Sequence, residues 1–174
     1  MELIPSFSVD HTLIVPGIYE SRVDTLGEEL VTTFDVRLIH PNKEPAIAPA
    51  AMHTMEHLVA TWLRNDPVWK DQLIYWGPMG CLTGFYIIVK GRPSAEEMYP
   101  VILEAFRYVS GYEGEVPGAA PENCGNYLMH DLPMAKWESA RYVKYLENAD
   151  KSVIFEYPKT EKLKLENDRV FFDS

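Results

Sequence analysis

Two histidines four residues apart, with a glutamate directly before the second, occupy the stretch His53-Thr54-Met55-Glu56-His57. Residues i and i+4 of an α-helix lie one turn apart on the same face, so a helix here would direct both imidazoles at one metal ion. Glu56 would project from the neighbouring strip and could reach a proton on whatever the metal activates. The alternative is that two surface histidines lie on an ordinary amphipathic helix.

The residues around this motif predict a helix that begins near residue 49 and ends near residue 66. Prolines crowd the preceding segment, Asn65 can take the left-handed cap position, and Pro67 prevents continuation. Apolar residues at helical spacing form a core-facing stripe: Met55, Leu58, Val59, Trp62 and Leu63. The motif therefore lies early in a predicted helix, which favours the metal-site interpretation.

The other elements are predicted from periodicity and capping residues. Apolar alternation over residues 30–39 predicts a half-buried strand, with Arg37 on the face opposite the main apolar side chains. That arginine is either exposed or contacts an anion or hydroxyl in a cleft. Further elements are expected as follows: an extended segment at 6–12, strands at 72–76 and 82–90, helices at 94–110 and 131–148, and a brief edge strand at 151–157.

Composition narrows the class of protein. The chain has 174 residues, 47% hydrophobic and 24% charged, which suits one globular domain spanning residues 1–174. Its net charge of −10 argues against nucleic acid or an anionic membrane as partner. No apolar run approaches the roughly 20 residues that span a bilayer, and no export sequence is apparent, so we expect a cytoplasmic protein. Residues 158–174 are charged, low in pattern and expected to form a surface tail.

Two cysteines complete the set of candidate reactive residues. Cys81 follows a tight turn, and Cys124 follows a Gly/Pro-rich loop at 114–121. Two imidazoles and one thiolate make a three-ligand metal site with an open position, as catalytic sites have, whereas structural zinc sites are closed by four ligands. From spacing alone either cysteine could be the third ligand, leaving the other for proton transfer with Glu56 as its complement. The alternative is that both are small buried hydrophobes.

Seven blocks of sequence point to a known family. In chain order they are Ser6-Phe7-x-Val9-Asp10-His11-Thr12, Phe34-Asp35-x-Arg37, Pro41-Asn42-Lys43-Glu44, His53-Thr54-x-Glu56-His57-Leu58, Arg64-Asn65, Pro78-Met79-Gly80-Cys81-x-Thr83-Gly84-Phe85-Tyr86 and Cys124-Gly125-x-Tyr127-x-Met129-His130. With these blocks, over about residues 4–148, the chain resembles the S-ribosylhomocysteine lyase (LuxS) family. The resemblance implies an α/β fold of the two-layer α+β kind, with helices packed against a mainly antiparallel sheet as in LuxS and metallopeptidase-like folds.

The resemblance also implies roles for individual residues. His53, His57 and Cys124 match the ligands of a ferrous ion that zinc or cobalt can replace. Glu56 and Cys81 match the two acid–base residues.

A substrate pocket is implied as well. Ser6, His11 and Arg37 match residues that line it, and Arg64 joins them as a predicted substrate contact. The family builds this pocket across a homodimer interface, so the N-terminal segment of one subunit would complete its partner's site.

The implied reaction is metal-dependent cleavage of S-ribosylhomocysteine. The sugar carbonyl migrates from C1 to C3 through enediolates, and β-elimination then releases the thioether. Cys81 would move protons on carbon and Glu56 protons on oxygen. The products would be homocysteine, of the activated methyl cycle, and 4,5-dihydroxy-2,3-pentanedione, the autoinducer-2 precursor used in quorum sensing.

One departure and two alternatives accompany the resemblance. The family usually has Asp-Ile-Ser where this chain has Tyr75-Trp76-Gly77, which bears on substrate affinity rather than on reaction class. An H-x-x-E-H metallopeptidase would share the helix motif and take a carboxylate such as Glu138 as third ligand. A non-catalytic metal-binding or signalling protein of the same fold is the second alternative.

Overall fold

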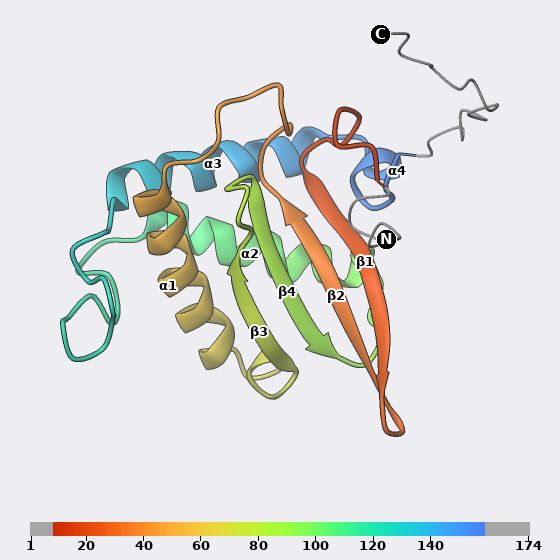
Figure 1. Cartoon of the computed structure of the whole chain (residues 1–174), viewed down its shortest axis with the longest axis horizontal. Coiled ribbons are helices and arrows are strands. Elements are labelled where there is room, and N and C mark those ends of the chain that lie inside the picture. The colour runs from red at the N-terminus through yellow and green to blue at the C-terminus, as the bar shows by residue number, and fades with distance from the viewer. Residues whose placement is uncertain (1–8, 159–174) are drawn as a thin grey trace, which may run out of the picture.

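A computed structural model describes residues 9–158 of the chain. Its elements form two layers, a four-stranded antiparallel sheet and the helices packed on one of its faces (Figure 1). The strand order is β1-β2-β4-β3. The elements are β1 (Gly17–Leu26), β2 (Glu29–Arg37), α1 (Pro49–Asn65), the 3₁₀ turn η2 (Trp69–Asp71), β3 (Leu73–Pro78), β4 (Gly84–Lys90), α2 (Ala95–Gly111), α3 (Leu132–Asn148) and α4 (Lys151–Ile154). The predicted fold class is confirmed.

The core lies between the sheet and helices α1, α2 and α3. Trp76 of β3 stacks on Phe85 of β4 with ring centroids 4.5 Å apart, and Phe106 of α2 meets the Trp76 ring edge-on at 6.1 Å. From α1, the predicted stripe is buried at Met55, Leu58, Val59 and Leu63, whereas Trp62 is half-buried. The apolar stripe therefore fixes the rotation of α1, and the two histidines of its first turns lie beside that buried face.

Several predicted boundaries are confirmed by the capping contacts. The Ser94 hydroxyl accepts a hydrogen bond from the Glu97 amide, and the Glu97 carboxylate accepts one from the Ser94 amide, which forms the expected capping box of α2. The Asp131 carboxylate accepts from the Met134 amide at the start of α3. These side chains satisfy amide groups that a helix leaves free at its first turn.

Two predictions of local structure are wrong, one at the end of α1 and one at residues 151–157. The Asn65 backbone is helical, and its side-chain amide donates to the Thr61 carbonyl at 2.7 Å, so the left-handed cap does not form. The helix ends at Asn65, and the C-cap residue Asp66 that follows has an extended backbone. The edge strand expected at 151–157 is the short helix α4, because the Asp150 carboxylate caps it through the Ser152 amide at 2.9 Å.

Two further differences concern the N-terminal part of the chain. Strand β1 was not predicted; it pairs with β2 along its length, with a register shift between Glu20 and Arg22. Residues 11–13 form a turn rather than an extended segment, because the Asp10 carboxylate accepts from the Thr12 amide at 2.9 Å. The rest of the expected 6–12 segment, up to residue 8, lies outside the described residues, as does the tail from residue 159.

The second face of the sheet carries a row of polar and aromatic residues. Asp35 of β2 pairs with Tyr19 on one side and Tyr86 on the other, and Tyr86 pairs with Gly77 of β3. In Figure 1, none of the helices of the described region lies in front of this face. Within residues 9–158, no helix has the length and apolar character needed to cross a membrane.

Candidate active site

Helix α1 presents His53 and His57 with their ring orientations fixed by backbone carbonyls. The His53 Nδ1–H donates to the Met129 carbonyl at 2.8 Å, and the His57 Nδ1–H donates to the Pro117 carbonyl at 2.7 Å. A carbonyl can only accept, so each ring holds its proton on Nδ1 and leaves the Nε2 lone pair free. Histidines that bind metals are oriented in this way by the hydrogen bond of their other nitrogen.

Cys124 meets these imidazoles from the long connection between α2 and α3. Its Sγ lies 3.4 Å from His53 Nε2, and the Asn126 amide donates to the sulfur at 3.4 Å. Two donors bound to one tetrahedral ion with bonds of about 2.0–2.3 Å lie about 3.5 Å apart. The sulfur and the imidazole nitrogen thus have the spacing of two ligands of one ion.

His130 adds a fourth donor atom to this group. Donor atoms of His53, His57, Cys124 and His130 all lie within 4.8 Å of one another. The Thr54 hydroxyl donates to the Ala50 carbonyl, so its oxygen accepts from His130 Nδ1–H at 3.2 Å. The His130 proton is therefore on Nδ1.

The free nitrogen of His130 also fits a metal or a group bound to one. Its Nε2 is buried and has no hydrogen-bond partner among the described residues. Burial, and then the neighbouring His53 and His57, lower the pKa of His130, which favours the neutral ring that a ligand needs. A buried lone pair is costly when it has no partner. The imidazoles of His53, His57 and His130 and the thiol of Cys124 therefore fit a divalent ion. The sequence predicted His53, His57 and Cys124 as its ligands, and that assignment stays a prediction.

A separate pocket of about 310 Å³ surrounds Cys81. It brings together three residues predicted from the sequence: His11, Arg37 and Cys81. Asn42, Glu44 and Thr83 also line it. Its volume lies at the small end of the range for small-molecule sites.

The turn that carries Cys81 is fixed by backbone contacts on both sides. The Met79 amide donates to the Gly84 carbonyl, and the Ile47 amide donates to the Leu82 carbonyl, at 2.9 and 3.0 Å. Leu82 has φ +56°, a conformation that bulky residues rarely adopt and that is held here by these contacts. The exposed Cys81 thiol is thereby presented into the pocket from a rigid turn.

Arg37 is buried, so the exposed-arginine alternative is wrong. Its guanidinium makes two hydrogen bonds to the Asp35 carboxylate, Nε to Oδ1 at 3.1 Å and Nη2 to Oδ2 at 2.5 Å. Nη1 donates to Thr83 Oγ1 at 2.5 Å and lies 3.9 Å from Cys81 Sγ. Burial alone would lower the pKa of Arg37, but the Asp35 carboxylate raises it, so a permanent positive charge lies beside the thiol.

The remaining predicted residues are distributed as follows. Glu56 is half-buried on α1, next in sequence to His57. The Arg64 guanidinium donates to the Leu73 and Ile74 carbonyls at 2.8 and 3.2 Å, which ties the end of α1 to β3; its contact with a substrate stays a prediction. Ser6 lies outside the described residues.

The Tyr75-Trp76-Gly77 departure has a local structural explanation. Trp76 is a core residue, whereas Tyr75 is exposed and folds over Gly77. A Cβ added at Gly77 would lie 2.0 Å from the Tyr75 hydroxyl. A side chain at position 77 would therefore require the exposed Tyr75 ring to move.

Comparison with known proteins agrees with this geometry. A family model described as S-Ribosylhomocysteinase (LuxS) matches residues 4–153. The chain belongs to the S-ribosylhomocysteinase (LuxS) family. Membership confirms the resemblance drawn from the seven sequence blocks and the expected enzyme class, a carbon–sulfur lyase.

Curated relatives named S-ribosylhomocysteine lyase match this chain over almost their whole length. The protein of Phocaeicola vulgatus is 56% identical over 162 residues, covering 92% of this chain and 100% of the relative. That of Porphyromonas gingivalis is 48% identical, covering 91% and 99%. That of Clostridium acetobutylicum is 45% identical, covering 85% and 94%.

Proposed function

We propose that this LuxS-family chain, as a single domain, cleaves S-ribosylhomocysteine to homocysteine and 4,5-dihydroxy-2,3-pentanedione. The observation that carries the proposal is the His53, His57, Cys124 and His130 donor group, found in a chain related over its length to S-ribosylhomocysteine lyases. The two products together contain every atom of the substrate, so neither an oxidant nor a second reactant is required. Carbonyl migration followed by β-elimination of the thioether accounts for this balance.

His53, His57 and Cys124 are the proposed metal ligands. Thiolate and imidazole donors suit Fe²⁺, and Zn²⁺ or Co²⁺ as substitutes, better than Mg²⁺ or Ca²⁺. A divalent ion bound there supplies Lewis-acid catalysis. The His130 ring stacks on the His53 ring, with centroids 4.2 Å apart, and supports the ligand set from that side.

Cys81 and Glu56 are the proposed acid–base pair. The Cys81 sulfur removes and returns protons on the sugar carbons, and the Arg37 charge 3.9 Å away attracts the sulfur in its thiolate form. Glu56 moves protons between the sugar oxygens and assists the final elimination. His11 and Arg37 line the Cys81 pocket, where sugar hydroxyls would bind, and Ser6 and Arg64 complete the proposed substrate contacts.

A homodimer is the proposed assembly. The face of the sheet that the described helices leave uncovered carries the half-buried Tyr86 and Ile88 and the exposed Tyr75. A second copy packed there would cover these apolar side chains. We propose the cytoplasm as the compartment, because both cysteines are free and these roles need them reduced.

The direct test is release of homocysteine from S-ribosylhomocysteine by anaerobically purified, iron-loaded protein, followed with a thiol reagent. A peptide mixture serves as the second substrate. We expect thiol release and no peptide cleavage. Peptide cleavage without thiol release would favour a metallopeptidase, and metal binding without either activity would favour a binding protein.

The structure gives the metallopeptidase alternative little support. Glu138, its candidate third ligand, accepts hydrogen bonds from Arg141 at 2.8 and 3.1 Å. It is not part of the donor group found among the described residues.

A further inference from the structure

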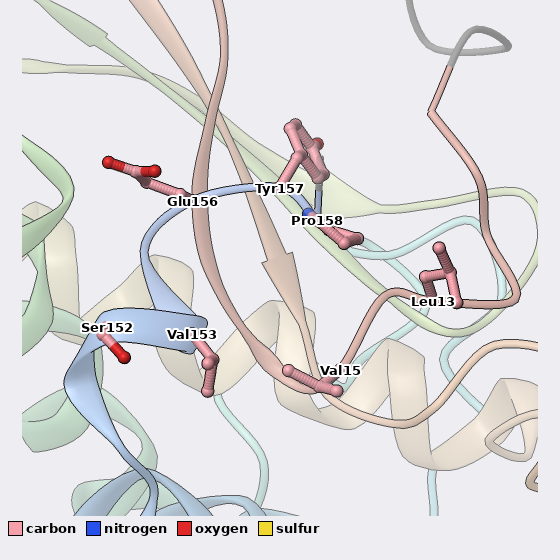
Figure 2. Close-up of a pocket in the computed structure, with 7 residues that line it drawn as sticks. All are labelled: Leu13, Val15, Ser152, Val153, Glu156, Tyr157 and Pro158. Carbon is pink, nitrogen blue, oxygen red and sulfur yellow. The ribbon is translucent and has the colours of Figure 1, made fainter. Parts of the chain in front are cut away.

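Tyr157 lies beyond the region, residues 4–153, that the family model matches. It belongs to the segment that follows α4 and returns beside β1, where it forms part of the wall of a second pocket together with Leu13, Val15 and Val153 (Figure 2). Its ring stacks on Tyr19 of β1, with centroids 4.7 Å apart and planes 11° from parallel. The hydroxyl donates to Asp35 Oδ2 at 2.9 Å.

Asp35 connects this hydroxyl to the pocket of Cys81. Asp35 and Arg37 each have about 2% of the side chain exposed, so both ions depend on protein partners. Asp35 Oδ2 accepts from both Tyr157 and Arg37 Nη2. Because the carboxylate holds one side of the guanidinium, Nη1 on the other side is directed at Thr83 and Cys81.

We propose that Tyr157 is a positioning residue that fixes the Asp35 carboxylate and, through it, the Arg37 guanidinium beside the Cys81 thiol. Burial, and then the charge of Asp35, raise the pKa of Tyr157, so its hydroxyl keeps its proton and remains a donor at neutral pH. Without this donor a buried carboxylate oxygen loses one of its two hydrogen bonds. The Asp35 carboxylate and the Arg37 guanidinium would then be free to turn away from the pocket.

Other charged or titratable groups also face the Cys81 pocket. His11 and Glu44 line it from the segment before β1 and the loop before α1, and Tyr86 of β4 interacts with both Asp35 and Cys81. Tyr157 hydrogen-bonds to none of these groups in the described region, so its effect on the thiol should pass through Asp35 and Arg37.

The test is the pH profile of Cys81 alkylation in the full-length, metal-loaded protein. Iodoacetamide labelling, read by mass spectrometry of the Cys81 peptide, separates this thiol from Cys124. Tyr157→Phe keeps the stacked ring and removes the hydroxyl. Tyr19→Phe is the matched control, because it removes a hydroxyl from the same ring stack that donates to the Val15 carbonyl instead.

We expect Tyr157→Phe to slow Cys81 alkylation at pH 7 by about threefold to tenfold, because the guanidinium charge is no longer held beside the sulfur. Tyr19→Phe should keep the wild-type profile. If Tyr157→Phe lowers the thermal midpoint but keeps the wild-type profile, the tyrosine is only structural and the proposal is overturned.

This inference rests on the proposed acid–base role of Cys81, but its measurement needs no substrate. Absence of lyase activity in the wild type would refute the proposed function and leave the alkylation comparison intact. An unchanged alkylation profile in an active enzyme would refute the role of Tyr157 alone.

Discussion

The donor atoms of the candidate metal site depend on residues far from them in sequence. His53 is oriented by Met129, His57 by Pro117, and His130 by Thr54. Each of these contacts joins α1 to the connection between α2 and α3 or to the residues just before α3. The site is therefore assembled only when that connection docks on α1.

Substitution of the donors should separate ligands from supporting residues. We expect His57→Ala and Cys124→Ala to lose the bound metal, because each removes a proposed ligand. His130→Gln should retain metal and weaken its binding by about 10- to 100-fold, as loss of groups that support ligands does elsewhere. Competition with a chelator, followed by the absorption of the cobalt-loaded protein, measures the metal affinity of each variant. Equal loss in all three variants would make His130 a full ligand.

Among single residues, the sequence predicted those whose partners are close in the chain. The i, i+4 spacing of His53 and His57 was sufficient to place both imidazoles together. Cys124 could be distinguished from Cys81 only through the family resemblance, because no local periodicity relates a thiol to a helix some 70 residues away. No local spacing pointed to His130 or Tyr157 for the same reason: their partners are distant in the chain.

Among the elements, the loop before α1 is tied to α3 by one carboxylate. Glu44 accepts from His40 Nδ1 at 2.6 Å and from the Arg141 guanidinium. Burial alone would raise the pKa of Glu44, but the hydrogen bonds from Arg141 and His40 lower it below its ordinary value of 4.5. The ionised carboxylate therefore stabilises the folded state.

Replacing this carboxylate should lower the free energy of unfolding by an amount that depends on pH. We expect Glu44→Gln to lower the free energy of unfolding by about 1 kcal/mol at pH 7, since the pair is partly exposed. Because the folded-state pKa is depressed, the stabilisation is complete above pH 4.5 and is lost as the pH falls below that value. Urea unfolding at several pH values measures this, with the exposed Glu28→Gln as control. A difference in unfolding free energy between wild type and Glu44→Gln that increases as the pH falls would contradict the depressed pKa of Glu44.

The turn that presents Cys81 depends on a glycine. A Cβ at Gly84 would lie 2.3 Å from the Val36 carbonyl oxygen, so β4 must move away from β2 to accept one. We expect Gly84→Ala to destabilise the protein by about 1–3 kcal/mol in urea unfolding, as overpacking generally does. Gly80→Ala is the control, because nothing lies within 4 Å of its added Cβ. Similar unfolding midpoints for the two variants would contradict the close approach.

Helices and strands with a regular apolar pattern were predicted from the sequence, and those with an irregular pattern were not. Helices α1, α2 and α3 and strand β2 follow from apolar periodicity and capping residues. Strand β1 was missed, and its register shift between Glu20 and Arg22 interrupts the alternation that identifies a strand. The edge strand at 151–157 was wrong because its β-forming residues follow Asp150, whose cap favours a helical turn.

At the scale of the whole molecule, the uncovered sheet face should form the dimer contact. We expect light scattering to give a mass twice that of one chain. Ile88→Glu should shift the protein to monomer, because it buries a charge in the contact. Val68→Glu, a change at an exposed position between α1 and η2 rather than in the sheet, should leave the dimer intact. A monomeric wild type would remove the assembly proposal.

The proposed lyase uses the metal group and the Cys81 pocket together. Its most direct test is homocysteine release from S-ribosylhomocysteine by wild type, Cys81→Ala and Glu56→Gln, with metal content measured in the same samples. We expect release by the wild type, and a loss of release in both variants while each keeps its metal. Undiminished release by either metal-loaded variant would contradict the role of that residue, and no release by the metal-loaded wild type would contradict the lyase function itself.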